Sequence, residues 1–133
     1  MSWDIYAFDI PDEFTSVQAI PKDFKPASLG SRAELISKII EVAPTADFSD
    51  PAWGTLDGDG WAIEISLSQE EDSTGFAFHV RGGDGAVGAV GAILDHLRIR
   101  AVDAQTGDFF TAGPEALKSF QQWRAYRDQI VGR

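Results

Sequence analysis

The stretch FAFHVRGGDG, residues 76–85, contains the residues of this chain best suited to chemistry. His79 and Arg81 are two positions apart in a strand-like run, so their side chains share one face of a β-sheet. If the preceding strand pairs with this run in simple register, Glu64 joins the same face. A carboxylate, an imidazole and a guanidinium together could perform acid–base chemistry. This pattern predicts His79 as an acid–base residue and Arg81 as an anion clamp, with Glu64 and Tyr6 beside them.

The corner Gly82-Gly83-Asp84-Gly85 allows two interpretations. In the first, its backbone amides and the N-terminus of the next helix bind an anion, and Arg81, Gly82, Gly83 and Asp84 form a ligand site. In the second, which we favour, the glycines let the chain turn and the Asp84 carboxylate caps the helix. An aspartate cap would occupy the positive helix end and repel an incoming anion. The pattern is neither a dinucleotide-binding motif nor a Walker loop.

Other motifs for chemistry are weak. The segment Asp57-Gly-Asp-Gly60 begins like a calcium loop, but Trp61 and Ser68 stand where an EF-hand needs ligands. A tight hairpin is predicted there instead. The two histidines, His79 and His96, are scattered and cysteine is absent, so we expect neither a metal site nor another cofactor. The tryptophans are predicted to anchor the core and the hairpins, namely Trp3, Trp53, Trp61 and Trp123.

The chain has a net charge of −10 that is unevenly distributed. Residues 1–97 carry 17 acidic and 5 basic side chains, whereas residues 98–133 carry 4 acidic and 6 basic ones. Such a field repels phosphate backbones and anionic lipids, which disfavours nucleic-acid and membrane binding. The simplest interpretation is a surface that keeps the protein soluble. The field also attracts a basic protein partner, for which the predicted contacts are Asp57, Asp59, Glu70, Glu71 and Asp72.

Length and composition predict a single domain over residues 1–133. The start, MSWDIYAFDI, lacks a basic segment followed by an apolar run, as a secretory signal would have. No apolar stretch approaches the roughly 20 residues that a membrane helix needs. We therefore expect a cytoplasmic protein, which the absence of cysteine also fits.

The elements that position these residues follow from hydrophobic periodicity. Alternation over residues 61–81 predicts two strands whose inward side chains are Trp61, Ile63, Ile65 and Leu67 and then Phe76, Phe78 and Val80. Ser31 and Glu34 form a capping box that starts a helix over residues 31–43, before Pro44. Further strands are predicted at residues 3–9, 53–56 and 98–102, with a long ordered loop at 10–30, a helix over 84–97 and a last helix from Pro114.

The helix over 84–97 has two faces of different character. Its apolar stripe comprises Val87, Val90, Leu94 and Leu97. Gly85, Gly88 and Ala92 form a small-residue strip, which predicts close approach of the helix backbone to the sheet. The element order β-α-β-β-β-α-β-α predicts an α+β fold. We expect an antiparallel or mixed five-stranded sheet with helices mainly on one face.

Four segments carry a family resemblance: MSWDIYAFDIP, ADFSDPAWGTLDGDGWAIEISL, FAFHVRGGDG and LRIRAVDAQTGDFF. Over residues 1–110 the chain resembles a family of small, acidic, uncharacterised bacterial proteins, and this resemblance implies no activity. In its acidic α+β character, tryptophan-rich hairpins and Asp-x-x-Thr-Gly turn it is similar in style to immunity proteins of bacterial toxin systems.

Three functional hypotheses follow. The first is a non-enzymatic acidic interaction module, immunity-like, that neutralises a basic partner. The alternative is a small enzyme or anion binder that uses the open sheet face around Glu64, His79 and Arg81. The third is a homodimer whose interface is the last helix or an edge strand.

Overall fold

The computed structural model describes residues 2–67, 73–110, 121 and 125. Along the chain its elements are β1 (Trp3–Phe8), the 3-10 helix η1 (Val17–Ala19), α1 (Arg32–Val42), β2 (Trp53–Gly58), β3 (Trp61–Ser66), β4 (Gly75–Gly82), α2 (Gly85–Leu97) and β5 (Arg100–Asp103). Of the predicted last helix only Gln121 and Ala125 are described, and both are helical. Trp123 and the acidic run Glu70, Glu71 and Asp72 lie outside the described residues.

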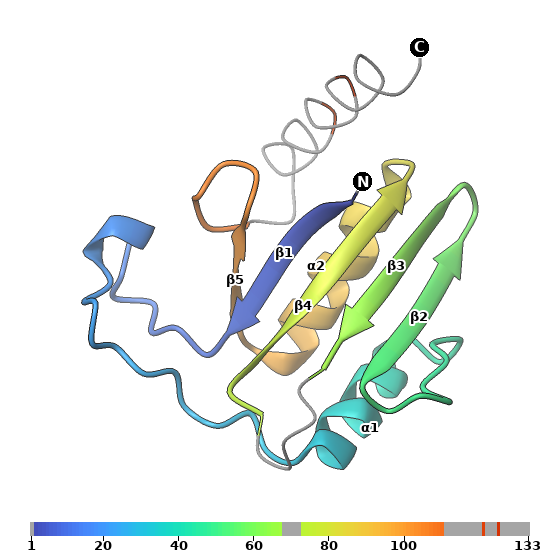
Figure 1. The fold of residues 1–133 in the computed structure, drawn as a ribbon, viewed down its shortest axis with the longest axis horizontal. Helices are drawn as coiled ribbons and strands as arrows, with labels where there is room; N and C mark the ends of the chain where they lie inside the picture. Colours follow the sequence, from blue (N-terminus) through green and yellow to red (C-terminus); the bar gives the residue numbers. More distant parts are fainter. Residues whose placement is uncertain (1, 68–72, 111–120, 122–124, 126–133) are drawn as a thin grey trace.

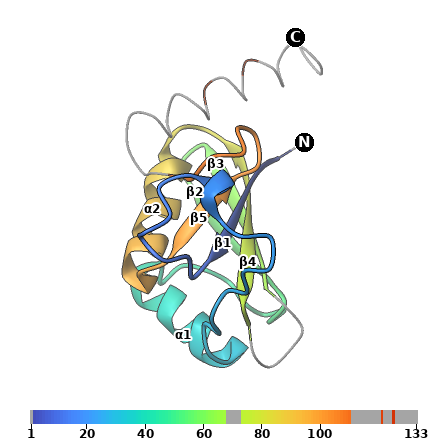
Figure 2. The same ribbon diagram turned by 90° about the vertical axis from the view of Figure 1, so that its left-hand side faces the viewer.

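The five strands form one sheet in the order β2-β3-β4-β1-β5, and every neighbouring pair is antiparallel (Figure 1). β1 therefore inserts between β4 and β5, which are far from it in the sequence. Both α1 and α2 lie on the same side of the sheet (Figure 2). The predicted α+β fold is confirmed. We call the sheet face away from α1 and α2 the open face.

The core lies between the sheet and the two helices. Ile63, Ile65, Phe78 and Val80 are fully buried, and Trp3 is exposed by only 1%. Because successive side chains of a strand alternate between faces, burial of these residues turns their neighbours to the open face. The predicted inward sets on β3 and β4 are confirmed, with Trp61 half-buried near the β2–β3 turn.

α1 begins at its predicted cap. The Ser31 hydroxyl accepts the backbone N–H of Glu34 at 3.1 Å, and Leu35 and Ile39 face the core. The return bond of the capping box is not made within the described residues, because the Glu34 carboxylate lies beside Gly30 instead. The helix ends at Val42, before Pro44, as predicted.

α2 corrects the prediction for its cap. Asp84 precedes the helix in a right-handed helical conformation, and its carboxylate makes no capping bond to the helix amides. A capping side chain reaches back over the first turn from an extended backbone, which Asp84 does not have. Its carboxylate instead accepts a hydrogen bond from Gln121 Nε2 at 3.2 Å.

The small-residue strip of α2 approaches the sheet only at its start, where a Cβ on Gly85 would lie 2.7 Å from Trp61 Nε1 of β3. Gly85, Gly88 and Ala92 are exposed, and a Cβ on Gly88 would meet nothing within 4 Å. The helix instead buries its larger apolar side chains, which gain more from leaving water than glycine does. These buried residues are Ala86, Val87, Val90, Ile93 and Leu94.

The end of α2 explains why the last strand starts later than predicted. Arg98 follows the helix with φ of 56°, in the left-handed conformation, and its N–H and that of Ile99 bond back to the last turn. This Schellman-type ending uses residue 98 to stop the helix. β5 therefore begins at Arg100.

Both outer strands carry an additional bridge. At the β2 edge, Asp47 and Thr55 exchange two backbone hydrogen bonds of 2.8 and 2.9 Å. At the β5 edge, Val102 forms an antiparallel bridge with Phe109. Part of each sheet edge is thus already hydrogen-bonded.

The long loop after β1 is attached to the body by an arginine. Arg100 Nη1 donates to the carbonyl oxygens of Pro11 at 3.0 Å and Phe14 at 2.7 Å. Phe14 and Phe24 are half-buried and pack edge to face, with ring centroids 5.7 Å apart. Arg100 therefore holds this loop against β5, and two aromatic side chains of the loop pack on each other.

Candidate functional site

Strand register assembles the candidate site on the open face. Glu64 of β3 pairs with His79 of β4, and His79 pairs with Asp4 of β1. These three side chains form one row across the sheet, and Arg81 lies two positions from His79 on the same face. The simple register that the sequence analysis required is present, and the structure adds Asp4, which sequence reasoning missed.

The charged side chains of the row bind one another. His79 Nδ1 lies 2.8 Å from Asp4 Oδ1, which also accepts a hydrogen bond of 2.6 Å from the Ser2 hydroxyl. Arg81 Nη1 donates to Glu64 Oε1. The Arg81 side chain is 50% exposed and that of His79 is 21% exposed. Ion pairs this close to solvent stabilise a fold by about 1 kcal/mol at most.

An exposed tryptophan completes the site. The Trp53 ring stacks on the His79 ring, with centroids 5.5 Å apart and planes inclined by 18°. Trp53 is 41% exposed, so of the two predicted roles it does not anchor the core. The signal was present in the sequence of β2, where Gly54 and Leu56 alternate toward the core and place Trp53 on the other side. Tyr6, on the same face of β1, is 40% exposed.

The Asp4–His79 pair has the geometry of a base with an orienting carboxylate. When Nδ1 carries the proton it donates to Asp4, and Nε2 is then the free acceptor. Nε2 has no hydrogen-bond partner within the described residues. The predicted anion clamp, Arg81, is engaged by Glu64, so it could bind an anion only by exchanging that partner.

The glycine corner after β4 is tightly packed. Gly82 has φ of 96°, and a Cβ there would lie 2.5 Å from the Gly60 carbonyl oxygen. Only glycine fits such a backbone without strain. The Gly83 amide donates to the same oxygen at 2.8 Å, so it is not available to an anion. The ligand site at Arg81, Gly82, Gly83 and Asp84 stays a prediction, with one amide fewer than proposed.

The predicted acidic contacts divide between two places. Asp57 is exposed on β2, on the same face as Trp53, and Asp59 is exposed in the turn before β3. The open face therefore carries Asp4, Asp57 and Glu64 together. In the part of the chain that the structure describes, no three potential ligand side chains gather in a metal-binding group. None of its helices combines the length and apolar character that crossing a membrane requires.

Neither a family model, nor a curated protein, nor a solved structure matches the chain. The resemblance to acidic bacterial proteins therefore stays a prediction.

Proposed function

We propose that this protein is a non-enzymatic interaction module that binds a basic protein partner through its open face. The observation that carries the proposal is the exposure of Tyr6 at 40% and Trp53 at 41% on that face. The only other large apolar side chain exposed among the described residues is Ile40, on α1. Exposed aromatic residues are enriched at protein interfaces, where they supply contact area with few rotatable bonds.

The charges around these rings favour a basic partner. The open face has three carboxylates, from Asp4, Asp57 and Glu64, against the guanidinium of Arg81, which already binds Glu64. An arginine or lysine of a partner would find carboxylates for pairing and aromatic faces for cation–π contact. The charge of the whole chain, −10, would accelerate such an encounter.

Hydrogen bonds at both edges of the sheet also favour binding by the open face. Adding a strand to a sheet requires free N–H and C=O groups along an outer strand. The bridges at Thr55 and Val102 occupy part of both edges. A partner therefore docks more readily on the side chains of the open face than on an edge.

Two matched double variants test this proposal. Trp53→Ala with Asp57→Lys changes the open face. Ile40→Ala with Asp95→Lys also removes one exposed apolar side chain and reverses one charge, on the exposed surfaces of α1 and α2. A basic protein captured from cells of the source organism is identified, purified and titrated against all three proteins. We expect the open-face variant to bind at least about tenfold more weakly, and wild-type affinity to fall steeply with salt.

The control variant is expected to bind like the wild type. Equal losses in both variants would show that binding does not use the open face. If the wild-type protein retains no basic protein at low salt, the proposal is wrong.

A second candidate function is supported by the Asp4–His79 contact of 2.8 Å. It is a small enzyme or anion binder in which His79 Nε2 accepts a proton and Arg81 releases Glu64 to hold an anion. Titration with inorganic phosphate distinguishes this function by NMR. Shifts of the His79 ring signals that grow in Glu64→Gln would support it, and unchanged signals would exclude it.

A further inference from the structure

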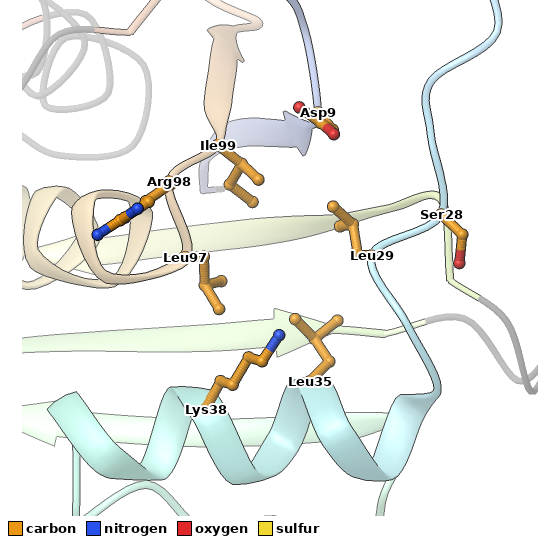
Figure 3. A pocket seen from close by; sticks show the side chains of 8 residues that line it. All are labelled: Asp9, Ser28, Leu29, Leu35, Lys38, Leu97, Arg98 and Ile99. Atoms are coloured by element: carbon orange, nitrogen blue, oxygen red, sulfur yellow. The ribbon is translucent and has the colours of Figure 1, made fainter.

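A second site lies on the helix-covered side, away from the open face. A cleft of about 190 Å³ opens where α1, the end of α2 and the long loop after β1 meet (Figure 3). Leu29, Leu97 and Ile99 are partly exposed and contribute apolar surface to it, whereas Leu35 lies buried beneath them. Its charged side chains come from three elements of the fold and include both signs, as Asp9, Lys38 and Arg98.

The ammonium group of Lys38 points into this cleft. Figure 3 shows its ammonium group pointing from α1 into the space bordered by Leu29 and Leu97. Lys38 has no ion pair or hydrogen bond with another described side chain. In a chain of net charge −10, an ammonium left without a carboxylate beside an apolar surface is available to an anionic group.

Asp9 supplies the opposite charge. It follows β1 and lines the cleft across from Lys38 in Figure 3, with apolar side chains between them. Asp9 also has no ion pair within the described residues. A simple anion would be repelled by Asp9, and a simple cation would be repelled by Lys38. A ligand that carries both charges satisfies both side chains.

We propose that this cleft binds a small zwitterion of the amino-acid class. Its carboxylate binds Lys38, its ammonium binds Asp9, and its apolar side chain packs on Leu29, Leu97 and Ile99. The cleft volume, about 190 Å³, exceeds the roughly 150 Å³ of a cavity that holds benzene, so the cleft has room for a small organic molecule. This site is independent of the partner-binding face.

Arg98 contributes charge at the rim. Its side chain extends along the end of α2 in Figure 3, away from Leu35. The guanidinium therefore does not occupy the cleft. The left-handed backbone of Arg98 would suit glycine better, so Arg98→Gly separates its charge from its role in ending the helix.

NMR titration of the full chain with three small probes tests the ligand class. The probes are leucine, 4-methylpentanoate, which lacks the ammonium, and 3-methylbutylamine, which lacks the carboxylate. We expect leucine to shift the amide signals of Leu29, Leu35 and Leu97 with a Kd in the millimolar range. Each analogue is expected to bind at least about tenfold more weakly. Absence of shifts at about 50 mM leucine, or equal affinity for all three probes, would overturn the proposal.

Matched substitutions test the assigned contacts. Lys38→Met and Asp9→Asn are each expected to weaken leucine binding about tenfold, and Asp9→Asn also removes the preference for leucine over 4-methylpentanoate. Lys25→Met removes an exposed lysine outside the cleft and is expected to leave the Kd unchanged. Thermal unfolding confirms that each variant is folded. Wild-type affinity in both cleft variants would refute the assignment.

Discussion

The two faces of the eight-residue strand β4 use alternate positions of one backbone in opposite ways. Phe78 and Val80 face the helices and are fully buried, whereas His79 and Arg81 face outward and bind carboxylates from neighbouring strands. Burial of an apolar side chain stabilises the fold by about 1.5–3 kcal/mol without demanding a particular partner. The outward ion pairs demand specific partners yet stabilise little. The covered side therefore determines the fold, and the open face is free to serve binding.

The largest expected effect is on the covered side. Phe78→Ala removes a side chain with no solvent exposure, so we expect unfolding free energy to fall by about 3–5 kcal/mol. His79→Ala, one residue away, is expected to lower it by less than about 1 kcal/mol. Urea denaturation of both variants measures the difference. Comparable losses would break the contrast between the two sides of β4.

Asp103 is the charged exception on the covered side. It is 3% exposed, and its carboxylate accepts hydrogen bonds from Trp3 Nε1 at 2.7 Å and from the Gln105 amide at 2.8 Å. Asp103→Ala leaves the buried indole N–H without this acceptor, so we expect a loss of about 2 kcal/mol. Asp103→Asn keeps an acceptor oxygen and is expected to lose less. If denaturation shows alanine to be the milder substitution, hydrogen bonding does not explain the burial of Asp103.

The Asp4–His79 contact is expected to add little to the free energy of unfolding. A double-mutant cycle with Asp4→Ala and His79→Ala is expected to yield a coupling energy of about 0.5 kcal/mol. Thermal or urea unfolding of the four proteins supplies the cycle. A coupling above about 2 kcal/mol would make this pair a structural element rather than an exchangeable contact.

The smallest effect on stability is expected at Asp47, which lies in the exposed segment beside β2. Hydrogen bonds from the Ser49 hydroxyl and then from its amide hold the pKa of Asp47 below its ordinary value of 3.8. Because folding lowers this pKa, ionised Asp47 favours the folded state. The contribution is complete above pH 3.8 and is lost as pH falls through the folded-state pKa.

Ser49→Ala removes the larger of the two causes, so the pKa of Asp47 is expected to rise toward 3.8 while the amide bond retains part of the shift. An NMR titration of the Asp47 carboxyl carbon measures both values. A pKa that stays the same or falls in the variant would show that the hydroxyl is not the cause.

Much of the fold could be predicted because alternation and periodicity are local signals. The pattern from Trp61 to Arg81 predicted which side chains of β3 and β4 face the core, and Ser31 marked the start of α1. The glycines of α2 misled because composition alone does not reveal rotation about the helix axis. Gly88 faces open space, and close approach requires glycine only at Gly85, at the start of the helix, and at Gly82, before it.

The candidate site could be predicted only in part, for a related reason. Glu64, His79 and Arg81 lie on adjacent strands joined by a hairpin, so their shared face followed from sequence order. Asp4 reaches His79 only because β1 inserts between β4 and β5, a pairing across most of the chain. No local pattern reports which distant strand becomes a neighbour, and for that reason the carboxylate that orients His79 was missed.

The bridges beside β2 and β5 protect the sheet edges when the protein is concentrated. Amyloid-like growth needs an outer strand whose backbone groups can template an arriving chain. Asp47 already engages Thr55 within the six-residue β2, and Phe109 engages Val102 within the four-residue β5. An incoming strand would have to displace these hydrogen bonds before it could stack. Purified protein at high concentration is therefore expected to resist fibril formation even when salt screens its negative charge.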